Sequence, residues 1–60
     1  MKFKAIRLSL NLTQDQVAAS LGVKRSTVAM WEAGKSKPRA DTLIKLSKLY
    51  KCTIEDLFRN

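Results

Sequence analysis

Sixty residues allow one domain at most, and a chain this short buries only about 60% of the surface that it exposes when unfolded. The single cysteine and the absence of histidine exclude a disulfide framework and a zinc site with the usual ligands. Twelve Lys and Arg residues against five acidic residues give a formal charge of +7, which indicates a polyanion or an anionic surface as partner. A soluble domain that is merely basic is the alternative.

The first two predicted helices cover about residues 2–10 and 13–21. Apolar residues at helical spacing give the first helix its buried stripe: Phe3, Ile6 and Leu10. Thr13 and Gln16 form a capping box at the start of the second helix. Gly22, which takes positive φ at little cost, ends it.

Three further helices are predicted over about residues 25–33, from residue 41 to 50, and from residue 53 onward. Gly34 ends the third helix, and the basic loop "KSKPRA" follows it. Asp41 is expected to cap the fourth helix, and Thr53 with Asp56 the fifth. Because no stretch alternates with period two, the predicted fold is all-α: a compact five-helix domain over residues 1–60.

Residues 14–32 have the pattern that a helix-turn-helix requires. Ala18 is small where the two helices would cross, and Gly22 lies where the chain must turn sharply. The second helix of such a motif buries one face and leaves the other free for the major groove of DNA. Trp31 lies three residues after Val28 on the predicted core face, so we expect it to pack in the core rather than stack on a base.

The chain resembles the phage-repressor and Cro-like helix-turn-helix family, also called the XRE family. The segments that carry the resemblance are "IR…LTQDQVAASLGV", "STVAMWEAGKSKP" and "TLIKLSKLYKCTIEDLF", and they extend from Phe3 to Phe58. The resemblance implies a lambda-repressor-like domain that binds double-stranded DNA as a homodimer on a palindromic operator and regulates transcription, as a repressor. It implies a cytoplasmic, nucleoid-associated protein of bacterial or phage type. It implies no cofactor, metal ion, membrane or small-molecule substrate.

Residue by residue, the resemblance implies contacts of two kinds with DNA. Base edges are expected to meet Arg25, Ser26 and Met30. Arg25 is the best candidate, because a guanidinium can bond O6 and N7 of guanine together. Phosphates are expected to meet six residues: Gln14, Lys24, Thr27, Lys35, Lys37 and Arg39.

Four of the phosphate assignments have structural alternatives. Lys24 stands where Ser, Thr or Asp commonly caps the third helix, so it either touches phosphate or is only a poor cap. The cations of the "KSKPR" loop could be no more than a solvated surface. Arg7 and Glu32 are implied to form a structural ion pair between the first and third helices.

Two other classes of function stay open. The same fold could serve as an antitoxin or adaptor-like module in which protein contacts dominate, and Leu8 with Leu57 and Phe58 could then belong to a partner surface. An enzyme has little support, because the chain has no histidine and its lone cysteine has no evident base.

Overall fold

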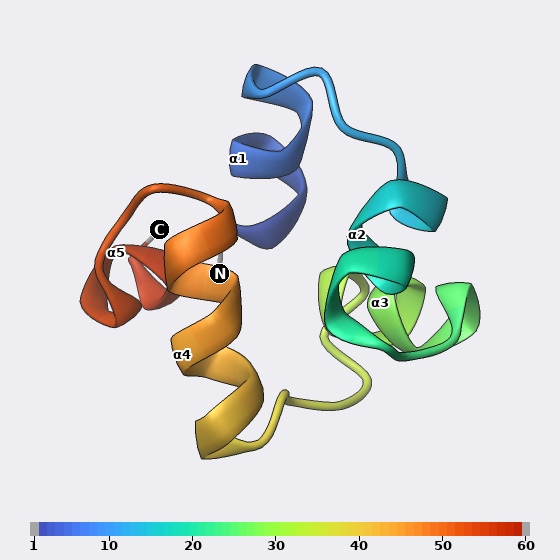
Figure 1. The fold of residues 1–60 in the computed structure, drawn as a ribbon. Coiled ribbons are helices and arrows are strands. Elements are labelled where there is room, and N and C mark those ends of the chain that lie inside the picture. The colour runs from blue at the N-terminus through green and yellow to red at the C-terminus, as the bar shows by residue number, and fades with distance from the viewer. Residues whose placement is uncertain (1, 60) are drawn as a thin grey trace.

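The computed structural model describes residues 2–59, which form five α-helices and, within that range, no β-strand. The helices are α1 (Phe3–Ser9), α2 (Gln14–Leu21), α3 (Arg25–Glu32), α4 (Ala40–Leu49) and α5 (Ile54–Phe58). In Figure 1, α2 and α3 lie together on one side of the molecule and α4 and α5 on the other. The all-α class and the five predicted helices are confirmed.

Capping boxes start α2 and α5, as the sequence predicts. The hydroxyl of Thr13 accepts from the backbone N–H of Gln16 at 3.0 Å, and the Gln16 side chain accepts from the N–H of Thr13 at 2.8 Å. Thr53 and Asp56 make the same reciprocal pair at α5. Each pair satisfies two N–H groups that the helix itself leaves free.

The prediction that Asp41 caps α4 is wrong. The helix begins one residue earlier, and its N-cap is Arg39, whose side chain makes no capping hydrogen bond. The chain leaves the buried Pro38 with Arg39 in an extended conformation, so the helical turn closes from Ala40 onward. Asp41 instead lies in the first turn, where its charge still favours the helix dipole.

The core of the domain is a single apolar cluster contributed by all five helices: Phe3, Val17, Ala18, Leu21, Val28, Trp31, Leu46, Tyr50 and Leu57. Trp31 is only 5% exposed, so it packs in the core and does not stack on a base. Leu57 is fully buried, which overturns its expected place on a partner surface, whereas Leu8 and Phe58 are exposed. The backbone N–H of Lys2 donates to the carbonyl of Leu57 at 3.0 Å and ties the start of the chain to α5.

Cys52 behaves as a small apolar residue at the edge of this core. It packs against the buried cluster, and burial, with the nearby charge of Asp56, raises the pKa of its thiol. A raised pKa keeps the thiol protonated at neutral pH and lowers its reactivity.

Candidate nucleic-acid interface

The turn between α2 and α3 fixes the orientation of α3. Gly22 has φ of 69°, in the left-handed region, and the N–H of Val23 donates to the carbonyl of Ala18 at 3.0 Å. Ala18 is 4% exposed and belongs to the buried core, and α2 packs against α3. The inner face of α3 therefore turns Val28 and Trp31 into the core.

The outer face of α3 is free. Ser26 and Met30 are exposed on the side of the helix away from Val28 and Trp31, and Arg25 is exposed at the first residue of the helix. Met30 is apolar, yet its residue surface is 43% exposed and it does not belong to the buried core. All three residues expected to face base edges are therefore exposed on α3.

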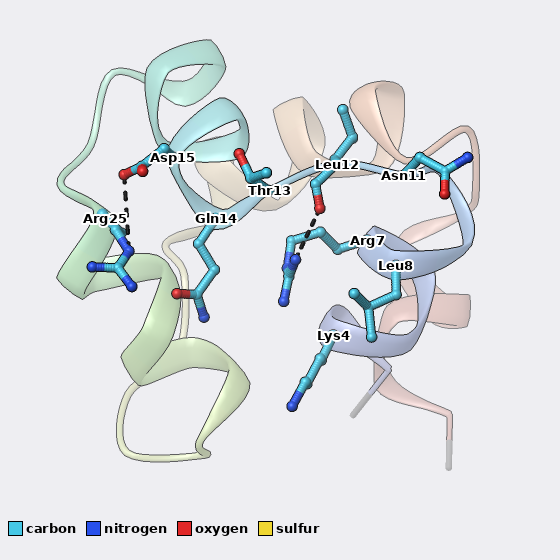
Figure 2. A pocket seen from close by; sticks show the side chains of 9 residues that line it. All are labelled: Lys4, Arg7, Leu8, Asn11, Leu12, Thr13, Gln14, Asp15 and Arg25. Carbon is cyan, nitrogen blue, oxygen red and sulfur yellow. Dashed lines mark hydrogen bonds and ion pairs between the residues drawn. The ribbon is translucent and has the colours of Figure 1, made fainter.

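Two surface hollows adjoin α3. One lies between α1 and the first turns of α2 and α3, and its lining includes Lys4, Gln14 and Arg25 (Figure 2). The other lies between α3, the following loop and the start of α4. Arg25 and Thr27, which line different hollows, are about 160° apart around the helix axis, since an α-helix turns about 100° per residue.

The second hollow brings together three residues expected to meet phosphate and one that sequence reasoning missed. Thr27, Lys37 and Arg39 line it. Ser36 also lines it, and its Oγ is buried without a hydrogen-bond partner among the described residues. A buried hydroxyl of this kind costs stability unless a ligand or water satisfies it. Serine in a loop gives no sequence signal of such burial.

Two other expected phosphate contacts lie outside the hollows. Lys24 and Lys35 are exposed, at the N-cap of α3 and in the turn after that helix. Lys35 is held at the backbone, where its N–H donates to the carbonyl of Met30 at 2.9 Å. Both lysines therefore flank the exposed face of α3, one at each end of the helix.

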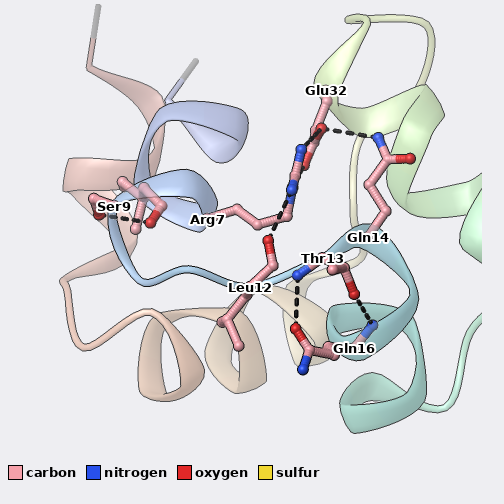
Figure 3. Close-up of polar contacts among 8 residues, drawn as sticks. Arg7, Ser9, Leu12, Thr13, Gln14, Gln16 and Glu32 are labelled. Carbon is pink, nitrogen blue, oxygen red and sulfur yellow. Dashed lines mark hydrogen bonds and ion pairs between the residues drawn. The ribbon is translucent and has the colours of Figure 1, made fainter.

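Arg7 and Glu32 form a buried, two-point ion pair between α1 and α3. Nε of Arg7 lies 2.7 Å from Oε2 of Glu32, and Nη2 lies 3.1 Å from Oε1 (Figure 3). The two side chains are only 9% and 5% exposed. Nη1 of Arg7 also donates to the carbonyl of Leu12 at 2.8 Å, which holds the segment between α1 and α2.

The protonation states in this cluster follow from its contacts. Burial alone would raise the pKa of Glu32, but hydrogen bonds from Arg7 and Gln14 together with the charge of Arg7 outweigh it, so the pKa falls below its usual value. The hydrogen bond to Glu32 likewise raises the pKa of Arg7. Burial, reinforced by the charge of Glu32, raises the pKa of the neighbouring Tyr50 to about 12. At neutral pH the pair is charged and the phenol is neutral.

Gln14 joins this cluster, which sequence reasoning did not anticipate. Its Nε2 donates to Oε1 of Glu32 at 3.0 Å, and its side chain is half-buried in the first turn of α2. An amide nitrogen carries two N–H donors, so one remains for a phosphate. Glu32 therefore fixes the orientation of the Gln14 side chain as well as the packing of α1 on α3.

The exposed acid Asp15 is the second residue that sequence reasoning missed. Its Oδ1 lies 3.9 Å from Nε of Arg25, so the residue expected to read bases is already next to a carboxylate (Figure 2). The residues are ten positions apart and lie on different helices, so the sequence pattern alone does not bring them together.

The cap of α3 offers a first prediction. Lys24 is the N-cap and makes no side-chain capping bond, so Lys24→Ser should raise the free energy of unfolding by about 0.5–2 kcal/mol. Chemical denaturation measures the gain. Unchanged affinity of the variant for duplex DNA would make Lys24 a poor cap and nothing more, whereas a uniform loss across sequences would assign it to phosphate.

Comparison with known proteins identifies the domain. The helix-turn-helix family model matches residues 3–57. The chain belongs to the helix-turn-helix family. The membership covers almost the whole chain and agrees with the turn at Gly22 and the packing of α3 on α2.

The relatives of this helix-turn-helix domain are named as transcriptional regulators. The HTH-type transcriptional activator BcrR of Enterococcus faecalis is 39% identical over 56 residues, which are 93% of this chain and 28% of that protein. An uncharacterized HTH-type transcriptional regulator, MJ0272 of Methanocaldococcus jannaschii, is 40% identical over 95% of this chain and 86% of its own length. The cryptic phage CTXphi transcriptional repressor RstR of Vibrio cholerae is 34% identical over 93% of this chain and 50% of its own length.

Within residues 2–59, no helix has the length and apolar character needed to cross a membrane. The same residues contain no group of three or more side chains that could hold a metal ion.

Proposed function

We propose that this helix-turn-helix domain binds double-stranded DNA in a sequence-specific manner and regulates transcription, with α3 in the major groove. The observation that carries the proposal is the exposed face of α3, where Arg25 lines one surface hollow and Thr27 lines another on the opposite side of the helix. The major groove is about 12 Å wide and admits one α-helix, with a phosphate backbone on either side. A reading face flanked by two phosphate-binding surfaces fits that arrangement.

The contacts with bases are assigned to the exposed face of α3, and the contacts with phosphates are assigned to residues on either side of it. Arg25 donates to O6 and N7 of a guanine, Ser26 bonds a neighbouring base edge, and Met30 packs on a thymine methyl. Phosphates on one side meet Gln14, whose amide lies in the first turn of α2, where the helix dipole also favours an anion. Phosphates on the other side meet four residues of α3 and the loop: Thr27, Lys35, Lys37 and Arg39.

Two copies are proposed to bind together, on a palindromic operator. A homodimer of this family places its two reading helices in successive major grooves about 34 Å apart. The relatives include one named activator and one named repressor, and we propose the repressor role for this chain. We place it in the cytoplasm, on the nucleoid, as a single non-catalytic domain over residues 1–60 with its motif at about 14–32.

Arg25→Ala tests which residue reads the sequence. The variant should lose about 1–3 kcal/mol of binding free energy on the preferred duplex and should relax the preference at one base pair, because it removes a two-point contact with guanine. Titration of a preferred and a scrambled duplex measures both effects. An equal loss on the two duplexes would make Arg25 a phosphate contact. Arg59→Ala is the matched control. Arg59 is also exposed, but it lies at the end of α5, and α5 is on the opposite side of the molecule from α3 (Figure 1).

A protein-interaction module, as in an antitoxin or an adaptor, is the second candidate. Exposed apolar side chains favour it: Leu8 is 54% exposed and Ile44 49% exposed. Tight association with a protein partner that survives the simultaneous change of Arg25 and Lys37 to alanine would support this candidate over DNA binding.

A further inference from the structure

Asp15 is a negatively charged residue on the surface that is proposed to bind DNA. It lies in the first turn of α2, and its side chain is 79% exposed. Among residues 14–39 the other acid is Glu32, whose side chain is 5% exposed and paired with Arg7. Asp15 is thus an exposed negative charge within this otherwise basic stretch, and a second exposed acid, Asp41, lines the hollow on the other side of α3. Phosphates within a Debye length, about 8 Å at physiological salt, would be repelled by it.

The position of Asp15 gives it access to one atom of Arg25 in particular. Oδ1 of Asp15 lies 3.9 Å from Nε of Arg25, whose own side chain is 68% exposed. Figure 2 shows the ion pair at Nε, with both terminal nitrogens of Arg25 directed away from Asp15. Those terminal nitrogens, Nη1 and Nη2, form the end of the guanidinium fork.

We propose that Asp15 is a positioning residue that sets the specificity of Arg25. This inference rests on the proposed function, in which Arg25 reads a guanine. A carboxylate at Nε leaves Nη1 and Nη2 for an end-on contact with O6 and N7. It also restricts the rotamers in which a long, mobile arginine would bind a phosphate of any sequence. Asp15 therefore lowers binding to DNA in general and raises the preference for one base pair.

A purely structural role makes a different prediction. An acid in the first turn stabilises α2 through the helix dipole. If that were its whole role, Asp15→Asn would lower the melting temperature and leave the base preference unchanged. The ratio of affinities for two duplexes separates the two roles, because a change in folding alone weakens both affinities by the same factor.

The experiment uses a duplex enriched from random DNA by the wild-type protein, and the same duplex with the G·C pair read by Arg25 replaced by A·T. Binding to both is measured for wild type, Asp15→Asn, Arg25→Ala and the double variant. Asp15→Asn should reduce the affinity ratio by about 1.4- to fivefold, the range expected for loss of one exposed ion pair, while binding to a scrambled duplex becomes tighter. In the Arg25→Ala background, Asp15→Asn should not change the ratio.

Two control variants complete the test. Glu55→Gln removes the same charge from an exposed acid on α5 and should leave the ratio at its wild-type value. Asp15→Glu keeps a carboxylate within reach of Nε and should restore most of the preference. Melting temperatures establish that each variant is folded.

The outcomes distinguish this inference from the function on which it rests. A ratio that stays the same or rises in Asp15→Asn overturns the role of Asp15 and leaves the proposed function standing. An equal fall in the presence and absence of Arg25 also overturns it, because Asp15 would then act through another group. Failure of the wild-type protein to enrich any duplex overturns the proposed function, and the inference with it.

Discussion

Glu32→Ala is expected to lower the free energy of unfolding by about 3–5 kcal/mol, the cost of leaving one partner of a buried pair without the other. Glu32 accepts two hydrogen bonds from Arg7 and one from Gln14, so its loss leaves three donor groups on two side chains without their acceptor. A sixty-residue domain has a total stability of roughly 3–9 kcal/mol, at about 0.05–0.15 kcal/mol per residue. The variant should therefore be partly or wholly unfolded at 25 °C, which circular dichroism and urea denaturation measure.

Glu55→Ala is the matched control for this loss. Glu55 is also a helical glutamate paired with an arginine, at 3.5 Å from Arg59, but its side chain is 74% exposed. Its replacement should cost less than about 1 kcal/mol. Equal losses for the two glutamates would contradict the structural role of the Arg7–Glu32 pair.

The same pair makes stability depend on pH in the acid range. The pKa of Glu32 is lowered in the folded state from an ordinary value of 4.5, so the ionised side chain favours folding. That contribution is fully present above the ordinary pKa and is lost as the pH falls through the lower, folded-state pKa. Glu32→Gln should remove this part of the acid dependence. Asp56 also has a lowered pKa, because of hydrogen bonds from Thr53, so the comparison is between variant and wild type.

Salt should weaken DNA binding steeply. Four of the expected phosphate contacts are cations: Lys24, Lys35, Lys37 and Arg39. With a slope of about −0.9 per neutralised phosphate, one copy should lose about 150-fold in affinity between 50 and 200 mM salt, and two copies about 20,000-fold. The slope of the logarithm of affinity against the logarithm of salt concentration, measured on one duplex, therefore reports both the contacts and the number of copies bound.

Single substitutions show which residues contribute to the salt dependence of DNA binding. Lys37→Gln should reduce it by about 1 for each copy bound, because one phosphate contact is lost. Arg59→Gln removes an equal charge at the end of α5 and should change it little. Equal slopes for wild type and Lys37→Gln would mean that the loop is a solvated surface.

Local signals made most of the fold predictable. The capping boxes at Thr13 and Thr53 and the glycine at position 22 depend on residues within a few positions of one another, so the sequence alone places these helix ends. Trp31 follows from helical periodicity, which depends only on spacing. The prediction that Asp41 caps α4 was wrong, because the start of α4 depends on the burial of Pro38 and the extended backbone of Arg39.

The parts of the site that the sequence did not predict depend on contacts between helices. Gln14 donates to Glu32 across eighteen positions, and Asp15 lies against Arg25 across the turn. The buried hydroxyl of Ser36 results from how the loop folds over α3 and α4. A pattern in one helix carries no information on which side chain of a second helix lies opposite it.

Selection from a pool of random duplex DNA, followed by sequencing, tests whether this domain binds a specific DNA sequence through α3. We expect enrichment of a two-fold-symmetric sequence with a guanine in each half, its half-sites one helical turn apart, and loss of preference at that guanine when Arg25 is changed to alanine. A pool that remains random after repeated rounds of selection by the folded wild-type protein would contradict it.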